Sequence, residues 1–111
     1  MRKMRIPLEQ DEKRGSVMTV KVLIKRNVPQ SNNEELMKLF AMLRSAAMHQ
    51  PGYIGGETLK RVDAPGKYLV ISSWKSVDDW SRWLVSSERR QIQERIDALT
   101  DSETKFEVYE H

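Results

Sequence analysis

Apolar and polar residues alternate along residues 17–26, the first regularly patterned part of the chain. Val20, Val22 and Ile24 occupy every second position. Lys21 lies between the first two of them, and Lys25 follows the last. A period of two places alternate side chains on one face of a strand, and β-branched residues favour strands. We therefore expect a first strand over residues 17–26.

The next stretch changes to a helical period. Its apolar residues recur at the spacing of one helix face: Leu36, Leu39, Phe40, Leu43 and Ala47. This spacing predicts a helix that ends at about His49, because Pro51 and Gly52 cannot continue the hydrogen-bond ladder. Ahead of it, Asn27–Gln30 predicts a turn, and Ser31–Glu34 has the spacing of a capping box.

Residues 53–75 have the pattern of a hairpin. Tyr53–Val62 and Lys67–Lys75 are both rich in strand-forming residues, and turn-forming residues separate them at Asp63–Gly66. The first of these strands contains Gly55 and Gly56, which predict a bulge or a close approach of another backbone.

Two further helices are expected between this hairpin and a final strand. Ser76 predicts the cap of a short helix whose apolar face holds Trp80, Trp83 and Leu84. A second helix restarts at Ser86 and carries Ile92, Ile96 and Leu99 at helical spacing. We interpret the charged residues Arg89 and Arg90 of this helix, with Glu88 and Glu94, as a solvated face. Thr104–Glu110 predicts the last strand.

The resulting order is strand, helix, strand, strand, helix pair, strand. It is the split arrangement of α+β, ferredoxin-like βαββαβ domains, with a four-stranded antiparallel sheet and helices on one face. Several strands also direct apolar residues to the other face, among them Leu23, Leu69 and Ile71. Because a monomer would expose this surface, we expect a homodimer that packs sheet on sheet.

Length and charge refine this picture. The 111 residues fit one domain, and of the net charge of +3 the first fifteen residues supply +2. We therefore expect a flexible, charged extension over residues 1–16 and one domain over residues 17–111, with Met18 as an alternative start of translation. The remaining domain is close to neutral, and its first strand has no aromatic residue, so we do not expect nucleic acid as a partner.

Composition excludes several classes of chemistry. There is no cysteine, and His49 and His111 are the two histidines, which leaves no disulfide, thiol nucleophile or multi-histidine metal site within one chain. No apolar run approaches the ~18–20 residues of a membrane span, and the N-terminal residues lack the apolar core of a secretory signal. We expect a cytoplasmic protein with no membrane or metal as a partner.

Three short segments carry a resemblance to a known family. Tyr68–Ser76 ends in Trp-Lys-Ser, Trp83–Ser86 reads Trp-Leu-Val-Ser, and His49–Tyr53 contains Pro-Gly-Tyr. Together they resemble the antibiotic biosynthesis monooxygenase superfamily over about Met18–Glu110. The resemblance implies a dimeric α/β-barrel with a pocket between the sheet and the helices of each subunit.

One branch of this superfamily implies a cofactor-independent monooxygenase. Its substrate, a small electron-rich aromatic or quinol, is itself the source of electrons for dioxygen. On this hypothesis the catalytic residues are Trp83, Asn27 and His49, and the substrate-binding residues are Tyr53, Trp80 and Arg82.

Alternative interpretations remain open. Large aromatic residues usually build cores, His49 suits a helix C-terminus, and Asn27 suits local backbone contacts. The heme-degrading branch implies an iron-binding histidine ten residues after the tryptophan, where this chain has Gln93. A non-catalytic dimer that binds a small ligand is a further alternative with the same fold.

Overall fold

The computed structural model describes residues 18–100 and 104–111 of the chain. The elements in these residues are β1 (Val20–Asn27), a short 3-10 turn η2 (Gln30–Asn32), α1 (Asn33–Met48), β2 (Tyr53–Lys60), β3 (Lys67–Trp74), α2 (Val77–Leu84), α3 (Ser87–Asp97) and β4 (Lys105–Glu110). The predicted order of strands and helices is confirmed. The extension expected over residues 1–16 lies outside the described residues.

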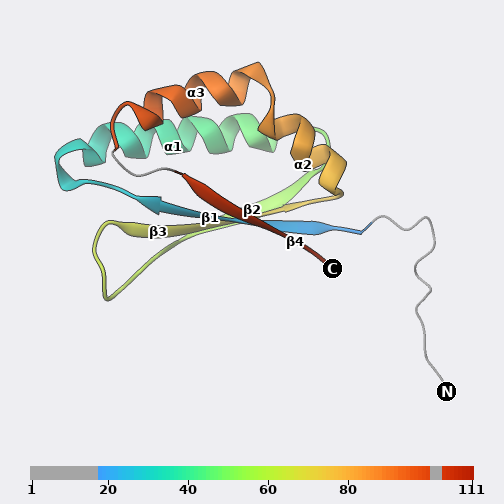
Figure 1. The fold of residues 1–111 in the computed structure, drawn as a ribbon, viewed down its shortest axis with the longest axis horizontal. Helices are drawn as coiled ribbons and strands as arrows, with labels where there is room; N and C mark the ends of the chain where they lie inside the picture. Colours follow the sequence, from blue (N-terminus) through green and yellow to red (C-terminus); the bar gives the residue numbers. More distant parts are fainter. Residues whose placement is uncertain (1–17, 101–103) are drawn as a thin grey trace.

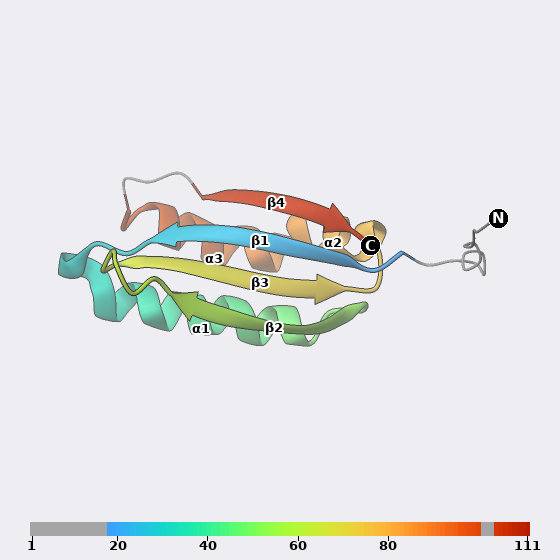
Figure 2. The same cartoon turned by 90° about the horizontal axis from the view of Figure 1, so that it is seen from below.

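The strands form one antiparallel sheet of four strands in the order β2-β3-β1-β4. Figure 1 shows α1, α2 and α3 on one side of this sheet, and Figure 2 shows the strands from the opposite, uncovered side. The α+β, ferredoxin-like arrangement is therefore the fold of this chain. β1 and β3 lie in the centre of the sheet, and β2 and β4 form its edges.

The core lies between the sheet and the helices. Alternate residues of β1 are buried, as the period of two predicts. The side chains that are almost completely buried come from both layers: Val20, Val22, Leu36, Leu39, Trp74 and Ile96. The inward series of β1 continues past Ile24 to Arg26, which places a charged residue at an interior position.

Serine side chains cap α2 and α3 as predicted. Ser76 Oγ accepts a hydrogen bond from the backbone N–H of Asp79 at 3.1 Å, and Ser86 Oγ accepts one from Arg89 N–H at 3.2 Å. These caps satisfy backbone donors that a helix start leaves unpaired. They define where each of the two short helices begins.

The predicted capping box at Ser31–Glu34 is wrong. Residues 30–32 form a 3-10 turn, so α1 begins at Asn33, and its N-cap is Asn32 without a side-chain capping bond. The Asn32 amide instead donates to the carbonyl oxygen of Leu99 at 2.8 Å. A long-range contact with the segment that follows α3 has replaced the local one, because the preceding turn moves Ser31 out of the capping position.

The hairpin of β2 and β3 contains the predicted bulge, where the register shifts between Tyr53 and Gly55. Its loop packs on the connection between β1 and α1, since Val28 N–H donates to the carbonyl of Gly66 at 2.7 Å. Gly66 has a φ of +89°, and a Cβ there would lie 2.9 Å from the carbonyl oxygen of Val28. Glycine is therefore required in this loop by both conformation and space.

The uncovered face of the sheet carries the apolar residues that the sequence assigns to it. Leu23 on β1 lies beside Ile71 on β3, and Leu69 lies beside Leu59 on β2. Leu59 and Tyr109 are 45% and 54% exposed. Within the part of the chain that the structure describes, no helix has the length and apolar character needed to cross a membrane.

Candidate functional site

A cavity of about 190 Å³ lies between the helix-covered face of the sheet and the helices. The residues that line it include Tyr53 of β2, Tyr68, Val70 and Trp74 of β3, Ile24 and Arg26 of β1, Met37 and Phe40 of α1, Trp80 and Trp83 of α2, and Arg89 of α3. Most of these side chains are apolar or aromatic. Such a lining favours a ligand with an apolar or aromatic body.

The cavity opens between α1 and β2. Its lining residues there are exposed to solvent: Ala41 and Arg44 on α1, and Glu57 and Thr58 on β2. Deeper lining residues such as Trp74, Trp80 and Trp83 are buried. The site therefore has a polar entrance and an aromatic interior.

Aromatic rings in edge-to-face contact form the inner wall. The ring centroids of Tyr53 and Trp74 are 5.3 Å apart, and those of Trp74 and Trp80 are 5.9 Å apart. Trp80 in turn contacts Phe106 of β4, with 5.6 Å between the centroids. Trp74 Nε1 donates to Ser72 Oγ at 3.1 Å, so its indole N–H is satisfied inside the wall. Interlocked rings of this kind form a rigid surface.

Helix α2 positions the two tryptophans of the cavity. Trp80 and Trp83 are three residues apart and therefore lie on one face of the helix. The Ser76 cap begins this helix directly after β3, which aims that face at the sheet. The sequence pattern alone predicts this face correctly.

Arg26 is the buried charge of the site. Its side chain is 7% exposed, and its guanidinium carbon lies 4.6 Å from the centroid of the Phe40 ring. Among residues 18–100 and 104–111, the Nη1 atom of Arg26 has no hydrogen-bond partner. Burial, and next the positive charge of Arg89, lower the pKa of Arg26 to about 10, while Asp97 acts in the opposite direction.

Arg89 is a second, partly buried cation beside the cavity. Its Nη1 donates to the carbonyl oxygen of Leu84 at 3.1 Å, across the break between α2 and α3. Burial lowers the pKa of Arg89, with Asp97 acting in the opposite direction. Our interpretation of Arg89 as part of a solvated face is therefore wrong, because the packing of α3 on α1 turns this position inward.

The cavity brings together half of the predicted site residues. Trp83, Trp80 and Tyr53 all line it. These are the aromatic members of the predicted set, and each comes from an element that packs its apolar face on the core. Arg26, Phe40 and Tyr68 also line the cavity, but the sequence did not identify them as site residues. The alternation of β1 could have identified Arg26, because it has the same parity as Val20, Val22 and Ile24.

The polar members of the predicted set lie elsewhere. His49 is exposed at the end of α1, where its Nδ1 lies 2.8 Å from the carbonyl oxygen of Ser45. Arg82 is exposed on α2 and pairs with Asp79 at 2.6 Å. That hydrogen bond, and then one from Ser76, lower the pKa of Asp79. Neither His49 nor Arg82 lines the cavity.

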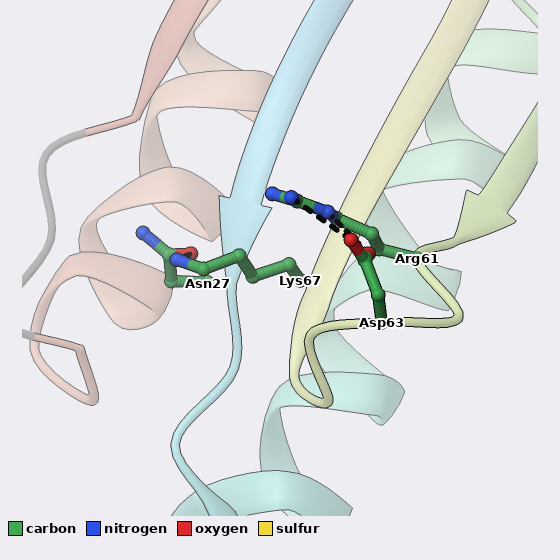
Figure 3. Close-up of polar contacts among 4 residues, drawn as sticks. All are labelled: Asn27, Arg61, Asp63 and Lys67. Atoms are coloured by element: carbon green, nitrogen blue, oxygen red, sulfur yellow. Dashed lines mark hydrogen bonds and ion pairs between the residues drawn. The ribbon is translucent and has the colours of Figure 1, made fainter.

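Asn27 also lies outside the cavity, at the end of β1. Figure 3 shows it beside Lys67, whose Nζ donates to Asn27 Oδ1 at 3.0 Å, near the ion pair of Arg61 and Asp63 at 2.6 Å. The Arg61 hydrogen bond lowers the pKa of Asp63. This group lies at the loop end of the sheet, and none of its members lines the cavity with Trp83.

Metal ligands are not gathered in this part of the protein. Within residues 18–100 and 104–111, no group of three or more His, Asp or Glu side chains is close enough to hold a metal ion. Gln93, where the resemblance to the heme-degrading branch implies an iron-binding histidine, donates through Nε2 to Asp97 and Thr104 at 2.9 and 3.1 Å. It lies on α3 outside the cavity.

Comparison with known proteins gives a family and a fold. The family model described as antibiotic biosynthesis monooxygenase matches residues 19–95. Curated relatives from two strains of Mycobacterium tuberculosis, both named heme oxygenase (mycobilin-producing), are 32% identical over 56 residues. The match covers 50% of this chain and 53% of the relative, so the chain spans about half the length of the curated relatives it matches.

Solved structures share the fold over most of the chain. A conserved protein from Methanosarcina mazei Go1 has a TM-score of 0.76 at 19% identity, over 84% of this chain and 92% of that one. SnoaB, a cofactor-independent oxygenase from Streptomyces nogalater, has a TM-score of 0.73 at 21% identity, over 83% and 91%. Rv0793 from Mycobacterium tuberculosis has a TM-score of 0.72 at 12% identity, over 81% and 91%. At these identities the similarity is one of fold.

Proposed function

Because the chain belongs to the antibiotic biosynthesis monooxygenase family, we propose that it is a cofactor-independent monooxygenase of a small electron-rich aromatic or quinol substrate. The observation that carries this proposal is the cavity: it opens to solvent between α1 and β2 and is walled inside by Tyr53, Trp80 and Trp83. Protein cores are close-packed and leave few spaces of this size, so an open cavity of this volume favours a ligand site. The cofactor-independent oxygenase with the same fold supports the reaction type.

The proposed reaction balances without a further reductant. The deprotonated quinol gives electrons to dioxygen, and a ring carbon forms a C–O bond to produce a hydroperoxide. The O–O bond then breaks, and water leaves with the hydrogen of that carbon, so that a carbonyl remains. A quinol and dioxygen thus give a hydroxyquinone and water. The protein binds, orients and desolvates the substrate.

The aromatic residues have defined parts in this proposal. Trp83 and Trp80 hold one side of the substrate ring, and Tyr53 of β2 extends this inner aromatic wall through its contact with Trp74. The catalytic parts predicted for Asn27 and His49, and the binding part predicted for Arg82, remain predictions. Alanine variants at these three positions test them, and we expect smaller losses of activity than at Trp83 because their side chains lie outside the cavity.

Heme degradation is the second candidate, because the curated relatives carry that activity in their name. The chain's own residues support it less. Gln93 stands at the position of the iron ligand, and His49 lies outside the cavity. A neutral amide is a poor axial ligand for heme iron. In a heme titration we expect no stoichiometric shift of the Soret band; a tight shift at one heme per chain would favour heme degradation instead.

The activity can be tested through oxygen consumption with a panel of quinols. We expect the wild-type protein to exceed the buffer rate, and Trp83→Phe to lose at least about tenfold in kcat/KM because the smaller ring holds the substrate less well. Trp83→Phe keeps an aromatic ring in the core, so the fold is retained. Val85→Ala, at an exposed position after the same helix, is the matched control and keeps the wild-type rate.

Two outcomes would contradict the proposal. If no quinol is consumed faster than in buffer while the panel still binds, the non-catalytic ligand-binding alternative is correct. If Trp83→Phe and Val85→Ala are equally active, the reaction takes place outside this cavity.

A further inference from the structure

The cavity contains a buried positive charge that forms no ion pair with any of the described residues. Arg26 is 7% exposed, and its Nη1 has no hydrogen-bond partner among the described residues. Its guanidinium carbon lies 4.6 Å from the centroid of the Phe40 ring. Buried charges in proteins are ordinarily paired, because an unpaired one loses the hydration that the unfolded chain provides. Among the described residues, Arg26 Nη1 is therefore a buried donor that a ligand in the cavity can use.

The fold places this group at the ligand space. Arg26 is the last inward residue of β1 and lies beside Tyr68 of β3, and both side chains line the cavity. Arg89 reaches the same space from α3 and adds a second positive charge. The acidic residue in the lining, Glu57, is exposed at the entrance on β2. Asp97, whose charge acts on both arginines, is exposed and is not a lining residue. The inner lining of the cavity therefore carries two cations, which favours an anionic ligand.

The volume limits the size of that ligand. An engineered cavity of about 150 Å³ in another protein binds benzene, whereas drug-sized ligands occupy pockets of about 300–1,000 Å³. At about 190 Å³, this cavity has room for one aromatic ring and a short polar arm. A ligand of several fused rings or a porphyrin exceeds it.

We propose that the cavity binds a single-ring aromatic carboxylate, with the ring against Trp74, Trp80 and Trp83 and the carboxylate accepting hydrogen bonds from Arg26. A guanidinium is suited to a carboxylate because both groups are planar and can form parallel hydrogen bonds. Taken with the proposed function, on which this part rests, the substrate is a quinol that carries a ring carboxylate. The carboxylate anchors the ring and is unchanged in the reaction.

The test is a binding titration that needs no turnover. Three probes are added without oxygen and followed by tryptophan fluorescence: 2,5-dihydroxybenzoate, its uncharged methyl ester, and hydroquinone. We expect the acid to bind at least about tenfold more tightly than the ester, since a charge-assisted hydrogen bond is worth about that factor. In Arg26→Met this preference falls to less than about twofold, and Arg26→Lys retains part of it.

Arg90→Met is the matched control, because Arg90 is an exposed arginine next to Arg89 on α3. It keeps the wild-type preference for the acid. Equal binding of acid and ester to the wild-type protein, or an acid preference that survives in Arg26→Met, would overturn the proposal.

Oxygen consumption with the same probes separates this inference from the proposed function. If the acid binds through Arg26 but is not oxidised, the proposed carboxylate site is supported and the proposed monooxygenase activity is contradicted. If hydroquinone and the ester are oxidised as fast as the acid, and bind as well, the monooxygenase stands and the carboxylate site fails.

Discussion

Arg26 shows how one residue can be costly for the fold and useful for the site. It continues the inward positions of β1, where Val20, Val22 and Ile24 are buried apolar residues. Neither an ion pair nor a hydrogen bond to Nη1 offsets its burial among the described residues. Sites that bind ligands often retain groups that reduce the stability of the free protein. Arg26 fits that pattern.

A stability measurement on Arg26→Met follows from this argument. We expect the free energy of unfolding of the ligand-free variant to exceed that of the wild type by about 1 kcal/mol or more, because an apolar side chain replaces a buried charge. The unfolding temperature should rise accordingly. Thermal unfolding followed by circular dichroism measures the change. Arg90→Met, at the exposed neighbour of Arg89, should stay within about 0.5 kcal/mol. A clearly less stable Arg26→Met would mean that the guanidinium has a stabilising partner in the free protein.

Helix α2 is the element that connects the fold to the site. It has eight residues, too few to be stable alone, and depends on its cap and on the burial of Trp80 and Trp83. The Ser76 cap joins it to the end of β3, so the same contact starts the helix and orients the two tryptophans. The position of the cavity wall therefore depends on a local hydrogen bond.

Loss of this cap should be measurable. We expect Ser76→Ala to destabilise the protein by about 1 kcal/mol, as N-cap substitutions commonly do. For a domain of this size that is a decrease of roughly 4–8 °C in the unfolding midpoint, measured by calorimetry. Ser81→Ala, at an exposed position inside the same helix, serves as the control. Equal midpoints for the two variants would show that the cap contributes nothing.

In the whole molecule, the uncovered face of the sheet presents apolar side chains that no helix of the described chain covers. It carries Leu23, Leu59, Leu69, Ile71 and Tyr109, in a layer that no helix covers in Figure 2. Apolar surface of this extent favours association between copies of the chain. We propose that two chains pack through this face, which leaves both cavity entrances on the outer, helical side.

Light scattering tests the proposed homodimer. At micromolar concentration we expect twice the protomer mass of 13.0 kDa. Leu23→Lys should shift the protein toward the monomer, because a charge in the centre of the interface is costly to desolvate. Val85→Lys, on the exposed helical side, should leave the mass unchanged. A wild-type mass of one protomer would rule the dimer out.

Local chemistry in the sequence was sufficient to predict most of the fold. The period of two gave β1, the helical spacing gave α1, and Ser76 and Ser86 marked the starts of the two later helices. These signals work because each depends on residues close together along the chain. The capping box at Ser31–Glu34 failed for the same reason: its pattern is local, but the Asn32 amide bonds to the distant Leu99.

The same difference between local signals and contacts of distant residues applies to the candidate site. Trp83, Trp80 and Tyr53 were predictable, because large aromatic residues on the apolar face of an element are directed inward wherever that element packs. Local patterns along the chain are therefore enough to predict the elements, their order and the aromatic wall. The packing of distant elements leaves a cavity beside that wall, brings Arg26 and Arg89 to it, and keeps Asn27, His49 and Arg82 away from it. A cavity is the space left between packed elements, and its shape and charge depend on contacts between residues far apart in the chain.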